Sequence, residues 1–306
     1  MAKKKPRFVE NIDNILATTQ TKENEELLFT FRGVLYPKRL CSLETFEAVA
    51  AMEARKDDRL IVAYPKCGTN WMLKIVNDMI AVIPSYKDLP PLENCPILEF
   101  GPPTKLQELG KQPSPRIIST HLHYDNIPKS FIEKKVKMLV LFRNPKDAAV
   151  SYYHFYNKNP ILPDVGSWDD FFPKFMNGEV CWKSYFDYIL AWDKHVDEEN
   201  VMIITYEELK ENLHEGVKRI AEFYELPLSD EMIKSVAENS TFQAMSSKSE
   251  ETHGRFAPVL FRKGAVGDWT TLFTEAQSRE MDAKFEECLA GTKLGAKLKY
   301  DQYCKF

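Results

Sequence analysis

The 306-residue sequence contains no run of about 18 apolar residues, the length that a membrane-spanning helix needs. Residues 1–10 are basic but lack the apolar core of a secretory signal. Lysine and arginine number 41 against 45 aspartate and glutamate, so no excess of positive charge favours a nucleic-acid partner. We therefore expect a chain with neither a membrane nor a nucleic-acid partner.

Cysteine is sparse as well, and no two cysteines have the Cys-x-x-Cys spacing of a redox or zinc site. A chain of this length can bury a sufficient core without disulfides. We therefore expect free thiols and a cytosolic protein. The six cysteines are Cys41, Cys67, Cys95, Cys181, Cys288 and Cys304.

Short apolar runs alternate with helical patterns along the chain. The runs have the continuous hydrophobicity of strands buried on both faces, and they are residues 59–64, 116–120, 137–142 and 201–205. The helices are expected at residues 71–83, 145–157, 180–195 and 207–224. This alternation predicts an α/β fold with a central parallel β-sheet that helices flank on both faces.

One domain accounts for most of the chain. We expect residues 1–28 to form an N-terminal tail and leading segment, and residues 29–306 to form the domain. Two long stretches with proline or glycine, residues 84–115 and 246–267, interrupt the pattern of strands and helices. Long loops in compact domains are usually lids or binding loops.

A candidate phosphate-binding loop follows the first buried run. Residues 64–71 read Tyr-Pro-Lys-Cys-Gly-Thr-Asn-Trp, so a glycine turn leads into a helix whose first N–H groups can bind an anion. A polar strand-to-helix turn with an incidental lysine is the alternative on position alone. The Walker pattern Gly-x-x-x-x-Gly-Lys-Ser/Thr is absent from the sequence, which disfavours a kinase that uses magnesium and ATP.

Three separated segments carry a family resemblance. Residues 65–71, residues 143–155 (Arg-Asn-Pro-Lys-Asp-Ala-Ala-Val-Ser-Tyr-Tyr-His-Phe) and residues 261–269 (Phe-Arg-Lys-Gly-Ala-Val-Gly-Asp-Trp) resemble the signature segments of the cytosolic sulfotransferases. The resemblance extends over residues 29–303. Within the family, residues 120–125, 240–245 and 288–300 resemble one subfamily in particular.

The resemblance implies 3′-phosphoadenosine 5′-phosphosulfate (PAPS) as co-substrate, 3′-phosphoadenosine 5′-phosphate (PAP) as product, and no metal. It implies a P-loop-like strand–loop–helix that holds the 5′-phosphosulfate through Lys66, Cys67, Gly68, Thr69 and Asn70. The residues implied for the 3′-phosphate are Arg143, Ser151, Arg262, Lys263 and Gly264. Trp71 and Phe242 would flank the adenine, and Tyr206 and Ser240 match further nucleotide positions. Taken singly, each of these residues could equally be a core or surface residue.

His121 follows the second apolar run and matches the general base of the family. An imidazole titrates near neutral pH, so it can take the proton of an attacking hydroxyl during in-line displacement. Lys66 is the cation expected to neutralise the departing phosphate oxygen. A buried structural histidine is the alternative for His121. His121 and His123 have the His-x-His spacing of two metal ligands, but no cysteine, histidine or carboxylate pattern nearby completes a zinc site.

The sequence departs from the family at several positions. Ser119 stands where many relatives have a lysine before the catalytic histidine, and Asn70 stands where a threonine is common. Cys67 replaces a common serine, and beside Lys66 and a helix start we expect its pKa to be lowered and its thiol to be sensitive to oxidation. These departures leave open a protein that binds PAPS with little or no transferase activity.

The acceptor is expected to be a small molecule with a phenolic or alcoholic hydroxyl. Ile97 replaces an aromatic residue of phenol-sulfating relatives, whereas Phe100 and Phe155 are retained. The resemblance implies thyroxine as one such acceptor. Residues 270–279 keep little of the family's dimerisation segment, so we expect a monomer or a weak homodimer.

Overall fold

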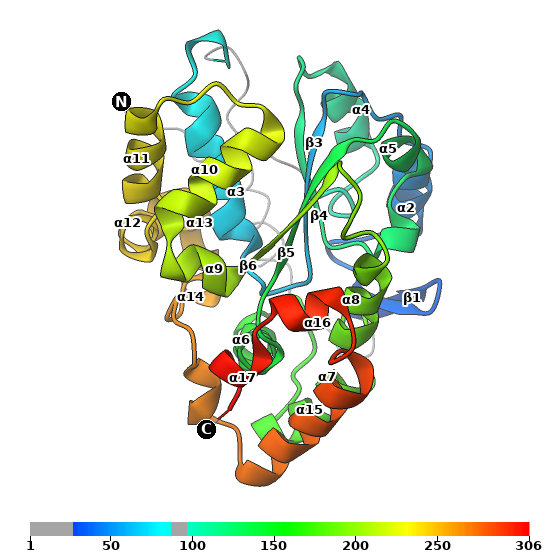
Figure 1. The fold of residues 1–306 in the computed structure, drawn as a ribbon. Coiled ribbons are helices and arrows are strands. Elements are labelled where there is room, and N and C mark those ends of the chain that lie inside the picture. Colours follow the sequence, from blue (N-terminus) through cyan, green and yellow to red (C-terminus); the bar gives the residue numbers. More distant parts are fainter. Residues whose placement is uncertain (1–26, 87–96, 306) are drawn as a thin grey trace.

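The structure, a computed structural model, describes residues 27–86 and 97–305 (Figure 1). Most of the expected N-terminal tail, and residues 87–96 of the stretch at residues 84–115, with Cys95 among them, lie outside the described residues. The described chain begins with an antiparallel hairpin of β1 (Leu28–Phe31) and β2 (Val34–Pro37), which the sequence patterns did not predict.

A four-stranded parallel sheet forms the centre of the molecule. Its strands are β3 (Arg59–Ala63), β4 (Ile117–Thr120), β5 (Lys137–Phe142) and β6 (Val201–Thr205). Their order is β4-β3-β5-β6, so Leu60 on β3 has Ile118 on one side and Met138 on the other. The four predicted runs are confirmed to within one residue, because strands covered on both faces are apolar throughout.

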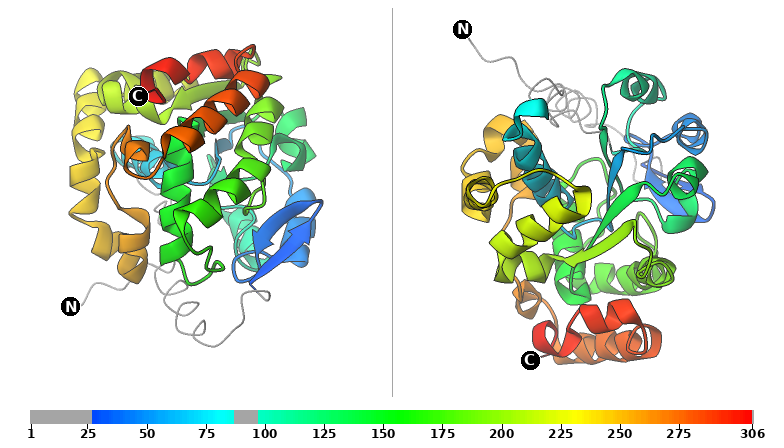
Figure 2. Two further views of the ribbon diagram at one scale, coloured as in Figure 1. Left: turned by 90° about the horizontal axis from the view of Figure 1, so that it is seen from below. Right: turned by 45° about the horizontal axis from the view of Figure 1, so that its top comes forward.

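Helices cover both faces of the sheet, as expected (Figures 1 and 2). One side carries α3 (Thr69–Ala81), α9 (Tyr206–Glu211), α10 (Leu213–Tyr224) and α11 (Asp230–Asn239). The other side carries α2 (Leu43–Ala50), α4 (Thr104–Lys111), α5 (Lys129–Glu133) and α8 (Tyr185–Asp193). The fold is therefore a single α/β domain.

Further helices lie beyond the carboxyl ends of the strands, in the lower part of Figure 1. They are α6 (Pro145–Lys158), α7 (Trp168–Asn177), η6 (Asp268–Thr271), α15 (Glu275–Cys288), α16 (Lys293–Lys297) and α17 (Tyr300–Tyr303). Pro145 opens α6 as predicted, and the side chain of Asn144 caps it by accepting from the Asp147 N–H. Short helical segments also occur at η2 (Pro84–Tyr86), η4 (Tyr124–Asn126) and α12 (Phe242–Ser246).

The expected helix at residues 180–195 is shorter than predicted. It begins only at Tyr185 and ends at Asp193. Trp182 and Lys183 have φ angles of 61° and 64°, which no α-helix accommodates. The apolar pattern at residues 180–184 reflects a buried turn against the hairpin, where Cys181 pairs with Leu35.

The expected helix at residues 207–224 is two helices. α9 ends at Glu211 and α10 begins at Leu213. Asn212 between them has φ and ψ of −148° and 87°, which are not helical, and its side chain caps α10. The stretch at residues 246–267, which we expected to be a long loop, contains α13 (Ser249–His253), η5 (Gly254–Phe256) and α14 (Ala257–Leu260). Helices of only three to five residues give too little periodicity to be recognised.

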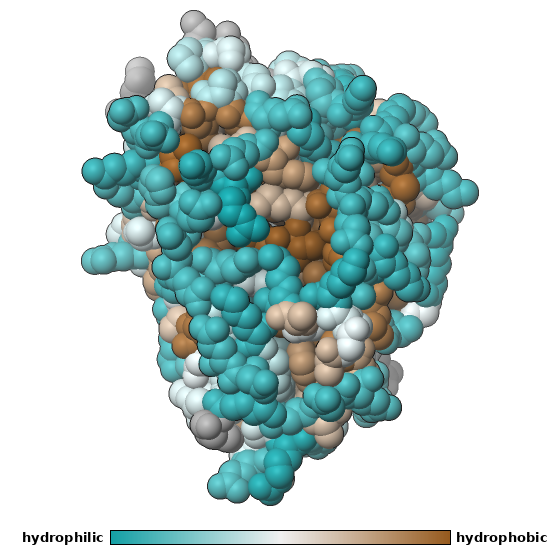
Figure 3. Space-filling model, in the orientation of Figure 1, coloured by the Kyte–Doolittle hydropathy of each residue, from teal (hydrophilic) through white to brown (hydrophobic). Residues whose placement is uncertain are grey.

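Apolar side chains gather in the middle of the face shown in Figure 3, over β6, and hydrophilic side chains surround them. Within residues 27–86 and 97–305, no helix is both long and apolar enough to span a membrane. Five of the cysteines lie in this part of the chain, and all five are free thiols.

Candidate active site

The candidate site lies at the carboxyl ends of β3, β4 and β5. The chain leaves β3 into α3 on one face of the sheet, and it leaves β4 towards the opposite face. Connections that diverge in this way open a crevice at the strand ends, where α/β proteins bind their ligands. The predicted phosphate loop, residues 64–71, follows β3 at this point.

The start of α3 is open to an anion. Gly68 precedes the helix with φ 113° and provides no side-chain cap, and the first bond within the helix runs from the Met72 N–H to the Gly68 carbonyl. The earlier N–H groups of Thr69, Asn70 and Trp71 are thus left for a ligand. The Thr69 hydroxyl is buried and has no hydrogen-bond partner. A Cβ at Gly68 would lie 3.1 Å from Leu141 Cδ2, so only glycine fits easily there.

Lys66 introduces a positive charge into the loop. Its Nζ lies 4.2 Å from the centre of the Phe155 ring. Burial first, and then the charges of Arg143 and Arg262, lower the pKa of Lys66 to about 7. Burial and the two neighbouring guanidinium groups therefore make the Lys66 amine of the free site easy to deprotonate.

The predicted lowering of the Cys67 pKa, and the sensitivity to oxidation that follows from it, are wrong. Its side chain is fully buried and its N–H donates to the Tyr64 carbonyl. Burial raises the pKa of the Cys67 thiol far above its usual value, and this effect exceeds the opposing influence of Arg143. Cys67 is a small core residue, and the thiolate that oxidation requires is disfavoured.

Arg143 lies directly after β5 and faces the loop. Its guanidinium donates to the Ala265 carbonyl at 2.9 Å, and its carbon atom Cζ lies 4.5 Å from the centre of the Tyr206 ring. Its Nε is buried without a hydrogen-bond partner. Ser151 lies half-buried two turns further along α6. Arg143 is thus positioned by its neighbours, and its buried Nε–H is still available to a ligand.

A second basic group comes from residues 262–264. Arg262 and Lys263 both form ion pairs with the buried carboxylate of Asp268. Gly264 has φ 61°, and a Cβ there would lie 2.1 Å from Phe242 Cδ2. The absence of a side chain at Gly264 therefore allows the Phe242 ring to lie against the backbone.

Two aromatic residues predicted to contact the nucleotide, Trp71 and Tyr206, are brought together. The rings of Trp71 and Tyr206 lie 5.0 Å apart, edge to face. The Trp71 Nε1 donates to the Ser240 carbonyl at 2.6 Å, and the Ser240 hydroxyl donates to Asp78 at 3.1 Å. Hydrogen bonds therefore connect α3 to the end of α11 beside the phosphate loop.

His121 follows β4 and is 8% exposed. Its Nδ1 lies 2.7 Å from the Ala63 carbonyl, which can only accept, so Nδ1 carries a proton and Nε2 of the neutral ring is an acceptor. Burial lowers the pKa of His121, with Lys66 acting in the same direction and Glu99 opposing. This geometry suits a base. His123, by contrast, donates to the Trp182 carbonyl, and its ring packs against Tyr188.

The residues predicted for the acceptor pocket lie on either side of this centre. The Phe100 ring is 6.0 Å from the His121 ring, and Phe155 lies beside Lys66. Ile97 pairs with Ser119 through the backbone and is half-buried. Ser119 itself is fully buried within β4.

Sequence reasoning missed two residues of this region. Glu99 is fully buried and accepts hydrogen bonds from the Thr120 hydroxyl, the His121 N–H and the Trp182 indole. The Trp182 ring lies 5.3 Å from that of His121. The available signal was a lone carboxylate, Glu99, inside the apolar run of residues 97–100. A carboxylate can be buried in such a run only where hydrogen-bond donors surround it.

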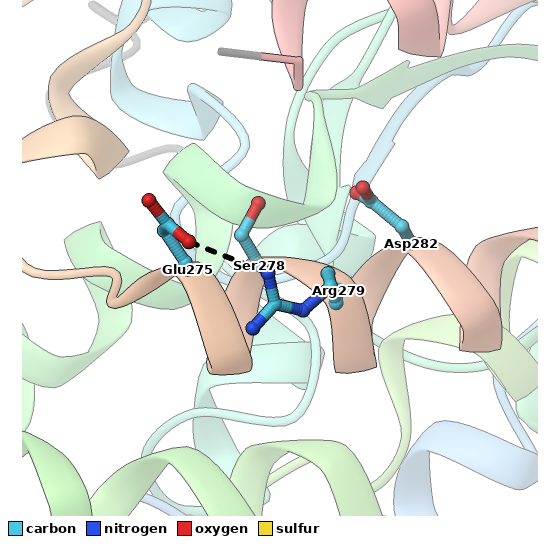
Figure 4. Close-up of a pocket in the computed structure, with 4 residues that line it drawn as sticks. All are labelled: Glu275, Ser278, Arg279 and Asp282. Atoms are coloured by element: carbon cyan, nitrogen blue, oxygen red, sulfur yellow. Dashed lines mark hydrogen bonds and ion pairs between the residues drawn. The ribbon is translucent and has the colours of Figure 1, made fainter.

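A hollow of about 400 Å³ lies elsewhere, along α15, and is lined by Glu275, Ser278, Arg279 and Asp282 (Figure 4). Arg279 pairs with Glu275, and Asp282 pairs with Lys146. The charged side chains that line this hollow are therefore already paired within the protein. No cluster of three or more potential metal-binding side chains occurs in the described parts of the chain.

Residues 56–293 match the sulfotransferase domain as a family. The chain belongs to the sulfotransferase family. It is 52% identical to human Sulfotransferase 6B1 over 98% of this chain and 99% of that protein. The zebrafish (Danio rerio) Sulfotransferase 6B1 is 50% identical over 95% and 98% of the two chains. The subfamily resemblance expected from three segments, and the expected enzyme class, are thereby confirmed.

The fold agrees with a solved sulfotransferase. The crystal structure of mouse sulfotransferase SULT7A1 complexed with PAP has a TM-score of 0.79 and 34% sequence identity to this chain. The likeness covers 89% of this chain and 98% of the mouse protein. The expected parallel sheet with helices on both faces is the sulfotransferase fold.

Proposed function

We propose that this sulfotransferase moves the sulfonate group of PAPS to the hydroxyl of a small phenolic or alcoholic acceptor and releases PAP. One observation carries the proposal: the uncapped start of α3, with the unpartnered Thr69 hydroxyl and Arg143 Nε, lies at the same sheet edge as the base-like His121. A related protein, mouse SULT7A1, was solved with PAP.

The residues present fit such a donor. Thr69 Oγ1 and Arg143 Nε are buried donors that need acceptors, and phosphate or sulfonate oxygens are acceptors. Lys66, Gly68, Thr69 and Asn70 would hold the 5′-phosphosulfate, and Cys67, buried and with its N–H on the Tyr64 carbonyl, would keep the shape of this loop. Arg143, Ser151, Arg262, Lys263 and Gly264 would hold the 3′-phosphate, for which the Arg262 and Lys263 contacts to Asp268 must loosen. Trp71, Phe242, Tyr206 and Ser240 would surround the adenosine.

PAPS supplies an activated sulfonate when it is bound. The acceptor oxygen forms a bond to sulfur as the bond from sulfur to the 5′-phosphate oxygen breaks, and that oxygen leaves with the electron pair. Nε2 of His121 takes the hydroxyl proton, because Nδ1 is committed to the Ala63 carbonyl. Protonated Lys66 neutralises the charge that develops on the leaving oxygen. No metal ion enters the proposed reaction.

Phe100 and Phe155 would form the walls of an apolar acceptor slot, and Ile97 would widen it relative to an aromatic side chain. Both rings lie close to catalytic groups, at His121 and Lys66 respectively. Thyroxine, a bulky phenol, is the acceptor that we propose to test first.

A PAPS-binding protein with little transferase activity is the second candidate. Ser119 favours it, because its side chain is buried within β4 and no cation reaches the site from this position. The intact His121 and Lys66 favour the enzyme.

Nucleotide selectivity and transfer test the two candidates together. We expect PAP to raise the melting temperature more than AMP, which lacks the 3′-phosphate, and more than ATP with magnesium. We then expect radiolabelled sulfonate to pass from PAPS to thyroxine or to members of a panel of phenols and sterols without added metal. Preferential stabilisation by ATP would contradict the proposed donor, and PAP binding without any transfer would favour the second candidate.

We further propose that the enzyme acts in the cytosol as a monomer or weak homodimer. Five free thiols support a reducing compartment. Thr270 and Arg279 occupy the two end positions of the stretch where relatives dimerise, and these positions lie on η6 and α15. Sedimentation at micromolar concentration should give mainly the 35.5 kDa species.

A further inference from the structure

Glu99 joins three segments that meet beside His121. Its Oε1 accepts from the His121 N–H at 2.9 Å and from the Trp182 Nε1 at 3.2 Å, and its Oε2 accepts from the Thr120 hydroxyl at 2.8 Å. The carboxylate is fully buried. A buried carboxylate is stable only where hydrogen-bond donors meet it. The three contacts therefore hold Glu99 in place, and they hold the segments around His121 and Trp182 in place as well.

These contacts extend to the wall around the base. The Trp182 ring lies 5.3 Å from the His121 ring and 5.9 Å from the Phe100 ring. Phe100 directly follows Glu99, and its own ring is 6.0 Å from that of His121. Glu99 therefore fixes the backbone of the base and the two aromatic rings that enclose it.

We propose that Glu99 is a positioning residue of the transfer reaction, which holds His121 and Trp182 in place and supplies the negative charge that favours the protonated imidazole formed when the acceptor loses its proton. This inference rests on the proposed function, in which His121 is the base. No ring nitrogen of His121 bonds to Glu99, because Nδ1 donates to the Ala63 carbonyl instead. The charge acts through space.

Few other charged groups face His121. Lys66, from the loop after β3, lowers its pKa together with burial, and Glu99 alone among nearby side chains raises it. Burial first and Glu99 second raise the pKa of Tyr36, Cys41 and Tyr188, so these neighbours of Glu99 stay neutral. Phe100 and Trp182 do not titrate. Glu99 is thus the nearby negative charge that offsets Lys66.

The substitution Glu99→Gln separates charge from shape. The amide oxygen can keep both N–H donors of His121 and Trp182, and the amide NH₂ can donate to the Thr120 hydroxyl. That hydroxyl can turn, because it acts as both donor and acceptor. The bonds from the His121 and Trp182 N–H groups are therefore retained with the shape of the side chain, whereas the negative charge is lost and the Thr120 hydroxyl hydrogen must turn away from its present acceptor.

The test is an NMR titration of the free enzyme with labelled histidine. The signal of His121 is assigned by its absence from His121→Ala. We expect Glu99→Gln to lower the pKa of His121 by about one unit, since an opposite charge within a few ångströms shifts a pKa by one to three units. Transfer should fall by about 10-fold in kcat, because a weaker base accepts the proton less readily, with the KM for PAPS unchanged. Glu53→Gln, which removes an exposed carboxylate, is the matched control and should change neither quantity.

A second variant tests the positioning role. Glu99→Asp keeps the charge but shortens the side chain, so it should leave the pKa of His121 near the wild-type value and raise the KM for the acceptor. An unchanged His121 pKa in a folded Glu99→Gln protein would overturn this inference and leave the proposed function intact. Undiminished transfer by His121→Ala would contradict the proposed base, and the inference with it.

Discussion

Lys66 lies in the loop between β3 and α3, within reach of the charges of Arg143, which follows β5, and of Arg262. Its pKa of about 7 means that, above neutral pH, the amine of the free protein is largely deprotonated. An anionic nucleotide favours the protonated form and raises this pKa again. Binding and proton uptake are therefore coupled at Lys66.

We predict that PAP binding at pH 8 takes up roughly one proton per site, because a group of pKa about 7 is mostly neutral at that pH before binding. Calorimetry in buffers with different ionisation enthalpies measures this uptake. Lys66→Arg, whose guanidinium is always protonated, should remove most of it while retaining a positive charge. Equal uptake by the two proteins would show that Lys66 is not the group that titrates.

Gly264 and Gly267 provide a matched pair. Both have positive φ, so alanine at either position costs about 1–2 kcal/mol of backbone strain. Only at Gly264 does the added Cβ collide, at 2.1 Å from the Phe242 ring, whereas at Gly267 it meets no atom within 4 Å.

We predict that Gly264→Ala weakens PAP binding by at least about 10-fold, or about 1.4 kcal/mol, because the Phe242 ring must leave its place. Gly267→Ala should bind PAP with nearly wild-type affinity. Equilibrium binding measures the PAP affinity of both variants. Equal losses of affinity would mean that the contact between Gly264 and Phe242 does not contribute to PAP binding.

Single residues were predictable from sequence where a motif surrounds them. His121, Lys66, Gly68 and Arg143 were found in this way, and the structure brings all four to one edge of the sheet. Cys67 was misjudged because its spacing near Lys66 and the helix start says nothing of its complete burial.

Glu99 and Trp182 escaped notice for a related reason. They are 83 positions apart in the sequence, and only the folded chain brings them to His121. No local pattern encodes such a contact.

At the scale of elements, β3 and β4 are held together at their amino ends by a buried ion pair. Arg116, with its side chain 2% exposed, donates from Nε to Asp58 Oδ1 at 2.7 Å. β3 and β4 lead into the phosphate loop and His121 respectively, so this pair supports the register on which the site depends.

We predict that Asp58→Ala destabilises the protein by about 3–5 kcal/mol, because the Arg116 charge is left buried without its carboxylate. Denaturant unfolding measures the change. Asp57→Ala, at the exposed neighbouring position, should cost about 0.5 kcal/mol or less. Similar losses in the two variants would contradict a special role for the buried pair.

The strands of the sheet could be predicted because burial on both faces makes them apolar throughout. Helix ends were less predictable. The apolar stripe continues from α9 to α10, whereas the break at Asn212 depends on its backbone angles and its capping side chain. Likewise, Trp182 and Lys183 adopt positive φ in a buried turn, although their sequence fits a helix.

At the scale of the whole molecule, the strand order β4-β3-β5-β6 explains how distant motifs form one site. β3 lies between β4 and β5, so the residues that follow these three strands, at Lys66, His121 and Arg143, meet at one edge. The strand–helix alternation predicted a parallel sheet but not this order. The order depends on which strands pair across the sheet, which periodicity does not reveal.

Comparison of the wild-type protein with His121→Ala tests the central claim most directly. Sulfonate transfer from PAPS to the best acceptor of the panel is measured without added metal, together with the affinity for PAP. We predict that the substitution lowers kcat by about 10²–10⁴-fold, as expected for loss of a general base, and leaves PAP affinity unchanged. Transfer by His121→Ala at the wild-type rate would contradict the claim.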